Sequence, residues 1–251
     1  FDIEDWYNCD FISGNLNWSA YESRIEQGVD QILEALSKRK LKGTFFCLGW
    51  LADNHPNVIK RIHSEGHQIG CHSYQHQLAT SFTADEFRED THKAQLALED
   101  VIGERVDAFR APGFSITQKN KEYLKILVEL GFKYDCSIFP AKHDYGGMPS
   151  YGKACPKIIQ VSKERTIKEF PINTQKILGT DLVFSGGGFF RIMPYWLINY
   201  WGTKAKYLMT YFHPRDFDFY QPRMTDLPKL RYFKSYVGLK KITIFALQFE
   251  L

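Results

Sequence analysis

In the first half of the chain, segments with the apolar spacing of a helix alternate with short apolar segments typical of a strand. Between residues 19 and 38 apolar residues recur every three or four positions, which predicts an amphipathic helix with Ser19 as its N-cap. The run 43–49 is short, β-branched and aromatic, and bounded by glycines, which is typical of a buried strand. This alternation repeats to residue 136. The predicted strands are 43–49, 66–72, 108–110 and 132–136, and the predicted helices are 19–38, 56–65, 83–102 and 117–130.

The second half of the chain is less regular but keeps the same kinds of element. We expect strands at 169–172 and 207–212 and a helix at 194–206, with an irregular excursion at 143–160. Repeated strand-then-helix units imply a parallel sheet covered by helices, and 251 residues is about the size of one α/β barrel. No repeat or linker divides the sequence, so we expect a single domain over residues 1–251.

Composition narrows the choice of partner and compartment. The 32 basic and 29 acidic residues give a net charge of +3, so no strong field favours nucleic acid as a ligand. No apolar run approaches the roughly 20 residues of a transmembrane segment, and the mean hydropathy is −0.35. The five cysteines form no C-x-x-C pair, which favours a reducing, cytoplasmic compartment. Because the sequence opens without a methionine, a removed signal peptide is the alternative.

Histidines and carboxylates gather at the ends of predicted strands. His72 and His76 follow one strand directly, and on one helical turn two imidazoles four residues apart can face a single metal ion. The acidic residues Asp2, Glu4 and Asp5 close the first strand-like segment. Carboxylates in that position could supply a further metal ligand and a separate general base.

Two more polar residues also end predicted strands. Arg110 follows the strand at 108–110, and His213 follows the strand at 207–212. In an α/β barrel the carboxyl ends of the strands gather at one face, where catalytic residues are found. We therefore expect these residues to share one site with the histidine pair and the acidic cluster.

Six short motifs occur in a fixed order along the chain. They are the acidic opening at 2–5, Gly-Thr-Phe-Phe at 43–46, Gly66-His67, His72-x-x-x-His76, Arg110-x-Pro112 and Phe212-His213. With these motifs the sequence resembles the polysaccharide deacetylases of the NodB-homology superfamily, carbohydrate esterase family four, in the branch associated with bacterial surface and exopolysaccharide loci. The resemblance implies a distorted (β/α) barrel with fewer than eight strands.

The resemblance implies that His72, His76 and one acidic residue hold a metal ion. The family metal is usually Zn²⁺, with Co²⁺, Ni²⁺ or Mn²⁺ as alternatives. We prefer Asp5 as the acidic ligand because it lies where the chain should turn into a loop. Glu4 is the alternative, because on a strand it would share a face with Asp2. Asp2 is then the general base.

The same resemblance assigns the remaining catalytic roles. Asp2 would take a proton from the attacking water, and Arg110 would orient Asp2. His213 would protonate the departing amine. Asp135 would tune His213, although a carboxylate at a strand end is as often a cap.

The segment Pro112-Gly113-Phe114 would supply a backbone N–H that stabilises the oxyanion and would contact the substrate. This segment departs from the family pattern, because Gly113 stands where many members have an aromatic residue. Phe114 could replace the missing ring. The late Asp-Trp motif of the family is also not evident.

These assignments predict a metal-dependent hydrolase that removes the N-acetyl group from an amino sugar in a bacterial polysaccharide or its precursor. Nine basic and three acidic residues between 203 and 241 favour an anionic precursor, although a solvated basic face explains them as well. Two alternatives remain. One is a small-amide C–N hydrolase of the same superfamily, and the other is a catalytically silent carbohydrate-binding barrel.

Overall fold

A seven-stranded sheet forms the centre of the computed structural model, which describes residues 1–8, 17–142, 145–177, 179–224 and 227–239. Five neighbouring pairs are parallel, and only the pair β6–β7 is antiparallel. The prediction of an α/β fold, a distorted (β/α) barrel with fewer than eight strands, is confirmed by this sheet. In sheet order the strands are β1 (Asp2–Ile3), β2 (Thr44–Cys47), β3 (Gln68–Cys71), β4 (Ala108–Phe109), β5 (Tyr134–Asp135), β7 (Thr166–Glu169) and β6 (Lys157–Gln160).

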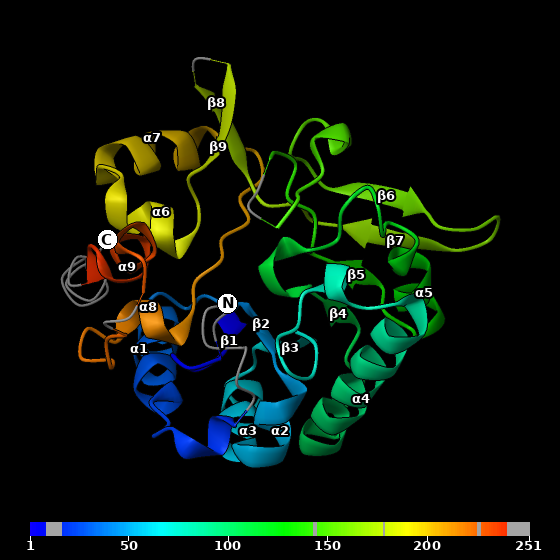
Figure 1. Cartoon of the computed structure of the whole chain (residues 1–251), viewed down its shortest axis with the longest axis horizontal. Helices are drawn as coiled ribbons and strands as arrows, with labels where there is room; N and C mark the ends of the chain where they lie inside the picture. The colour runs from blue at the N-terminus through cyan, green and yellow to red at the C-terminus, as the bar shows by residue number, and fades with distance from the viewer. Residues whose placement is uncertain (9–16, 143–144, 178, 225–226, 240–251) are drawn as a thin grey trace.

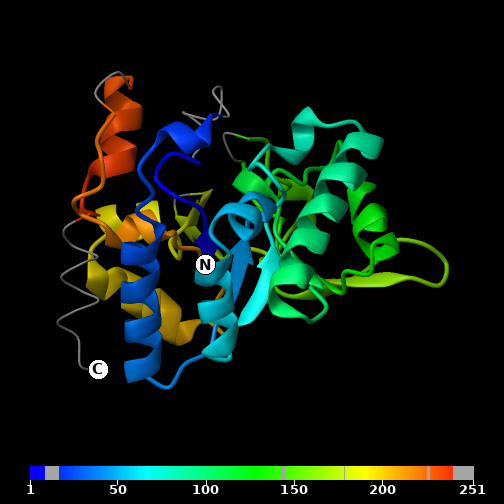
Figure 2. The same ribbon diagram turned by 90° about the horizontal axis from the view of Figure 1, so that it is seen from below.

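Helices from the first half of the chain cover one face of this sheet (Figures 1 and 2). Their apolar sides pack with the strands in one core, in which Ile32, Phe45 and Leu98 are almost fully buried. A capping box begins α4, because Thr83 and Glu86 each accept the other's backbone N–H. These helices are α1 (Ile25–Lys38), α2 (Gly49–Asn54), α3 (Pro56–Ser64), α4 (Ala84–Ile102) and α5 (Tyr123–Glu129).

After β7, the described residues form a separate two-stranded hairpin and four α-helices. In Figure 1 the hairpin projects past α6 and α7. None of the helices in the described part of the chain is long and apolar enough to cross a membrane. The elements are β8 (Thr174–Ile177), β9 (Thr180–Val183), α6 (Gly187–Ile192), α7 (Tyr195–Lys204), α8 (Pro214–Phe217) and α9 (Lys229–Tyr236).

The predicted strand at 207–212 is wrong, because this segment pairs by isolated bonds only. Its Phe212 carbonyl accepts the N–H of Asp2 at 2.9 Å, so the segment runs beside the free edge of β1. On its other side the N–H of Tyr211 donates to Ser185 at 3.2 Å. The extended segment therefore brings the residue that follows it, His213, to the end of β1.

The first helix is shorter than the predicted range 19–38. A 3₁₀ turn occupies Trp18–Ala20, and α1 begins only at Ile25. Between them, the side chain of Ser23 and the backbone N–H of Arg24 donate to the carboxylate of Asp5. These bonds compete with a helical start at Ser19, so the N-terminal segment fixes where α1 begins.

Candidate metal centre and active site

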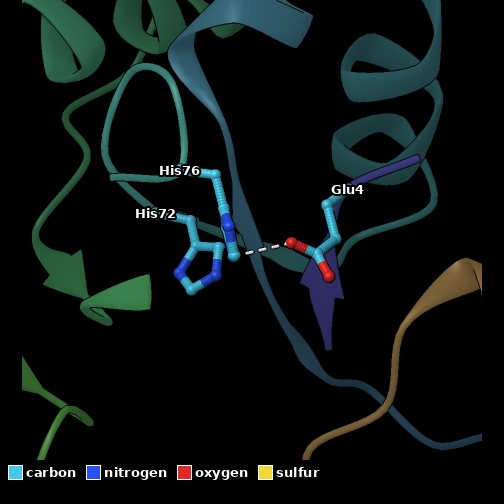
Figure 3. Close-up of side chains that lie close together, drawn as sticks. All are labelled: Glu4, His72 and His76. Atoms are coloured by element: carbon cyan, nitrogen blue, oxygen red, sulfur yellow. Dashed lines mark ion pairs between the residues drawn. The ribbon is translucent and has the colours of Figure 1, made fainter. Parts of the chain in front are cut away.

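Three side chains from separate parts of the sequence meet beyond the carboxyl ends of β1 and β3. Glu4 follows β1, and His72 and His76 follow β3. One ligand atom from each lies within 4.8 Å of the other two, and all three residues are buried. Figure 3 shows the imidazoles and the carboxylate close together, with Nε2 of His76 2.7 Å from Oε2 of Glu4. The cluster thus offers two nitrogen donors and one oxygen donor to one point.

The segment that carries both histidines is a loop and not the predicted helical turn. Ser73 and His76 have φ angles of 66° and 54°, in the left-handed region that residues with a Cβ rarely adopt. The carbonyls of Ser73 and Tyr74 accept N–H bonds of 3.0 Å from the start of α2, which anchors the loop. Strained backbone of this kind persists only where its surroundings hold it, and it concentrates at functional sites.

His72 is fixed in a form that suits a metal ligand. Its Nδ1 atom lies 2.6 Å from the carbonyl oxygen of Arg110, so Nδ1 carries the proton and Nε2 is left for the cluster. Burial lowers the pKa of His72 to about 4, which keeps its imidazole neutral near pH 7. Neutral imidazole is the form that binds metal ions.

The donor set fits a divalent transition metal. Two imidazoles and one carboxylate make up the three-ligand sets of several catalytic zinc sites, which leave coordination positions open for water and substrate. Burial by itself would raise the pKa of Glu4, but the neighbouring His76 and His213 outweigh it and lower that pKa. The carboxylate is therefore ionised and ready to bind a cation.

Asp5, the preferred acidic ligand, lies outside the cluster, and this preference is corrected. Its carboxylate accepts hydrogen bonds from the hydroxyl of Ser23 at 2.7 Å and from the backbone N–H of Arg24 at 2.9 Å. It also accepts the N–H of Trp6 at 2.8 Å. Side chains two apart on an extended chain share a face, so Glu4 lies with Asp2 on the site side. The alternative ligand, Glu4, is the one that the structure brings to the histidines.

This arrangement predicts opposite effects for two neighbouring carboxylates. Glu4→Gln should weaken Zn²⁺ binding by at least about tenfold, because a neutral amide replaces an ionised ligand. Asp5→Asn should leave Zn²⁺ affinity near the wild-type value and lower only thermal stability, because it disturbs bonds to Ser23 and Arg24. Competition with a chromophoric chelator measures both affinities. Loss of zinc in the Asp5 variant alone would restore Asp5 as the ligand.

Asp2 and Arg110, the predicted base and its orienting partner, are in direct contact. Nη1 of Arg110 lies 2.6 Å from Oδ1 of Asp2, and both residues are buried. Burial alone would raise the pKa of Asp2, but the guanidinium of Arg110 and the nearby His72 hold it well below its usual range. The guanidinium also lies 4.3 Å from the centre of the Phe46 ring. Asp2 is therefore an ionised carboxylate with one oxygen occupied by Arg110.

His213 lies beside the carboxylates of Glu4 and Asp2. Its Nε2 atom is 3.6 Å from Oε1 of Glu4 and 3.9 Å from Oδ2 of Asp2. Its Nδ1 atom is 3.1 Å from Oδ2 of Asp216. Burial by itself lowers the pKa of His213, but these three carboxylates outweigh it, so the net shift is upward. The imidazole is thus held as an acid beside the cluster.

Two residues of this site, Asp216 and Arg191, were not predicted. Asp216 accepts the backbone N–H of His213 at 2.9 Å as well as its side-chain bond, and its other oxygen pairs with the buried Arg191. A Cβ at Gly187 would overlap the Asp216 carboxylate, so this glycine allows the close approach. Pro214 at the first helical position and an acid three residues after His213 are signs of a capped helix, which could have indicated Asp216.

Asp135 does not make the predicted contact with His213, and this assignment is corrected to Asp216. The Asp135 carboxylate accepts the hydroxyl of Ser137 at 2.5 Å and shares a second hydrogen bond with Glu169. The sheet order explains the error, because β5 lies between β4 and β7 while His213 lies beside β1. Asp135 therefore makes its contacts at β5 and β7, away from His213.

The segment Pro112–Phe114 forms a strained turn after β4. Gly113 and Phe114 have φ angles of 60° and 52°. A Cβ at Gly113 would lie 2.8 Å from Leu78 and 2.9 Å from Tyr145, so the close packing excludes the larger residue that many family members place there. The ring of Phe114 packs edge-on against Tyr211 at 5.1 Å. The same ring lies 5.5 Å from the guanidinium of Arg110, so the turn lies close to the residue that holds Asp2.

Comparison with known proteins agrees with these features. Residues 18–134 match the family model described as polysaccharide deacetylase. This region, a little under half of the chain, is similar to the polysaccharide deacetylase family. Residues 136–244 match a second model, described as a domain of unknown function (DUF3473). That the whole sequence forms one domain, and its branch within the family, stay predictions.

Curated members of the family match less than half of this chain. The peptidoglycan-N-acetylglucosamine deacetylase of Bacillus cereus is 34% identical over 105 residues, 40% of this chain and 38% of that protein. The peptidoglycan-N-acetylmuramic acid deacetylase PdaA of Bacillus subtilis is 30% identical over 93 residues, 37% of this chain and 35% of that protein. A crystal structure of a Mycobacterium smegmatis protein assigned to this family covers 98% of this chain and 90% of its own, with a TM-score of 0.61 and 18% identity, which shows the fold.

Proposed function

We propose that this chain is a zinc-dependent N-deacetylase that releases acetate from N-acetylated amino sugars of a bacterial polysaccharide or its precursor. One observation carries the proposal. The buried donor set Glu4, His72 and His76 is flanked by an ionised carboxylate, Asp2, and by an imidazole with a raised pKa, His213. A metal site that lies between a base and an acid has the groups that amide hydrolysis needs. Relatives named as deacetylases of peptidoglycan amino sugars support the substrate class.

The base and its partner act on the attacking water. A divalent cation bound by the three ligands would acidify a coordinated water and polarise the acetyl oxygen. Asp2 accepts the proton of that water with Oδ2, because Oδ1 is held by Arg110. The buried ion pair keeps Asp2 ionised, and it fixes the direction in which the carboxylate presents its free oxygen.

The acid acts on the departing amine. A sugar amine is a poor leaving group unless its nitrogen is protonated as the C–N bond breaks. His213 presents Nε2 toward the acidic cluster, while Asp216 holds Nδ1 and stabilises the protonated ring. His213 therefore donates its proton to the nitrogen, and the pair with Arg191 keeps Asp216 in place.

The turn after β4 has one backbone donor for the developing oxyanion. Pro112 has no N–H, and Phe114 donates its own N–H to the carbonyl of Ala111 at 3.1 Å. The N–H of Gly113 is therefore the donor that we assign to the oxyanion.

Metal depletion and reconstitution test the proposal. Protein stripped by a chelator should release no acetate from N-acetylglucosamine oligomers, and Zn²⁺ should restore activity at about one ion per chain. Co²⁺, Ni²⁺ and Mn²⁺ are compared in the same assay, and His76→Ala should remain inactive with each ion. Acetate release that survives chelation would refute a metal-dependent enzyme. Activity on small cyclic amides but not on sugars would refute the proposed substrate.

A further inference from the structure

The peptide bond between Arg110 and Ala111 carries a hydrogen bond on each side. Its carbonyl oxygen accepts the Nδ1–H of His72 at 2.6 Å. Its N–H donates to the hydroxyl oxygen of Ser137 at 2.8 Å. The amide is planar and conjugated, so a stronger bond at its N–H makes its carbonyl oxygen a better acceptor. The peptide therefore links Ser137 electronically to a residue of the metal cluster.

The chain of hydrogen bonds continues to a carboxylate. The hydroxyl of Ser137 donates to Oδ1 of Asp135 at 2.5 Å, and both residues are fully buried. The hydrogen-bond donors of His72, Ala111 and Ser137 thus all point in the same direction along this series of bonds, toward Asp135. A negative charge at that end strengthens each bond in turn, and it makes the imidazole of His72 a stronger electron donor.

A second buried carboxyl group determines where the charge resides. Asp135 and Glu169 lie on the neighbouring strands β5 and β7 and share a hydrogen bond. Burial and the neighbouring Asp135 raise the pKa of Glu169 well above its usual value. Asp135 accepts the hydroxyl of Ser137 and backbone N–H groups of residues 136 and 137, whereas Glu169 accepts the N–H of Ile138 at 3.1 Å. Because Asp135 has more donors to stabilise a negative charge, Glu169 is the group that holds the shared proton. The charge of the pair stays on Asp135, at the end of the hydrogen-bond chain.

We propose that Asp135 and Ser137 are positioning residues for the metal centre, acting through the 110–111 peptide to orient His72 and strengthen its bond to the cation. The inference rests on the proposed metal centre and deepens it. It gives Asp135 a role on the ligand side of the site, whereas the sequence placed it beside the acid, His213. The structure supports this role through three consecutive buried hydrogen bonds.

Isosteric substitutions separate this role from simple packing. Ser137→Ala and Asp135→Asn should each weaken Zn²⁺ binding by about three- to tenfold, less than the loss expected for a group that touches a ligand directly. Glu169→Gln is the matched control, because the amide resembles the neutral carboxyl group in the same pair. Its Zn²⁺ affinity should stay within about twofold of wild type. Affinities are measured on the full chain by competition with a chromophoric chelator.

A spectroscopic readout distinguishes a change at the ligand from a loss of stability. The visible absorption bands of the Co²⁺-loaded protein should shift in Ser137→Ala and Asp135→Asn and stay unchanged in Glu169→Gln. Thermal unfolding of the metal-free proteins reports stability separately, and Ser137→Ala carries the test if Asp135→Asn does not fold. Wild-type affinity and spectra in Ser137→Ala would overturn the positioning role of Asp135 and Ser137 and leave the proposed function intact. An equal loss of Zn²⁺ affinity in Glu169→Gln would do the same. A wild-type chain that binds no Zn²⁺ would overturn both the proposed function and the positioning role.

Discussion

Asp2→Asn is expected to lower kcat for acetate release by about 100- to 10,000-fold, the usual contribution of a positioned general base. Asparagine keeps the shape of the side chain but cannot take a proton from the attacking water. The bound cation should stay in place, because Asp2 does not belong to the donor set of Glu4, His72 and His76. Steady-state kinetics and elemental analysis of the same preparation measure both quantities.

The Asp2 substitution needs a control for folding. Loss of the charge leaves the buried Arg110 without its 2.6 Å partner, and breaking a buried ion pair can cost about 3–5 kcal/mol. Circular dichroism and thermal unfolding must therefore show that the variant is folded at the assay temperature. Asp5→Asn is the matched control, because Asp5 is also buried but lies outside the cluster and should keep its kcat. A folded, zinc-loaded Asp2→Asn protein with wild-type kcat would remove Asp2 as the base.

Local patterns were enough to predict several elements of the fold. The glycine-bounded run at 43–49 and the capping box at Thr83 are complete within a few residues, and β2 and α4 form where they indicate. The segment 207–212 has the apolar composition of a strand but bonds to its neighbours only at isolated points. Whether an extended segment joins a sheet depends on partners distant in sequence, and composition does not reveal them.

The candidate site shows the same limit at the level of single residues. The two-residue period of an extended chain places Glu4 on the side of Asp2, so the sequence alone could have favoured Glu4 over Asp5 as the acidic ligand. The left-handed backbone at Ser73 and His76 could not be predicted, because residues with a Cβ adopt a positive φ only where their tertiary surroundings hold it. Arg191 gave no signal either, since only the tertiary fold brings it to Asp216.

His213→Ala is expected to lower kcat on an N-acetylated sugar by about 100- to 10,000-fold with the cation retained. The amine then leaves without a proton donor. The loss should nearly vanish with p-nitrophenyl acetate, because nitrophenolate leaves as a stable anion and needs no proton. Asp2→Asn should be slow with both substrates, since the attacking water must lose its proton in either case. An empty metal site in His213→Ala would instead make His213 a ligand.

The acid role of His213 also fixes the direction of the pH dependence. Activity requires the protonated imidazole, so it falls as the pH rises through the pKa of His213. Asp216 helps to raise that pKa through the 3.1 Å bond to Nδ1. Asp216→Asn should therefore move the alkaline limb of the kcat/KM profile to lower pH, while the limb with p-nitrophenyl acetate should not move. An alkaline limb that is the same in wild type and variant would mean that another group titrates there.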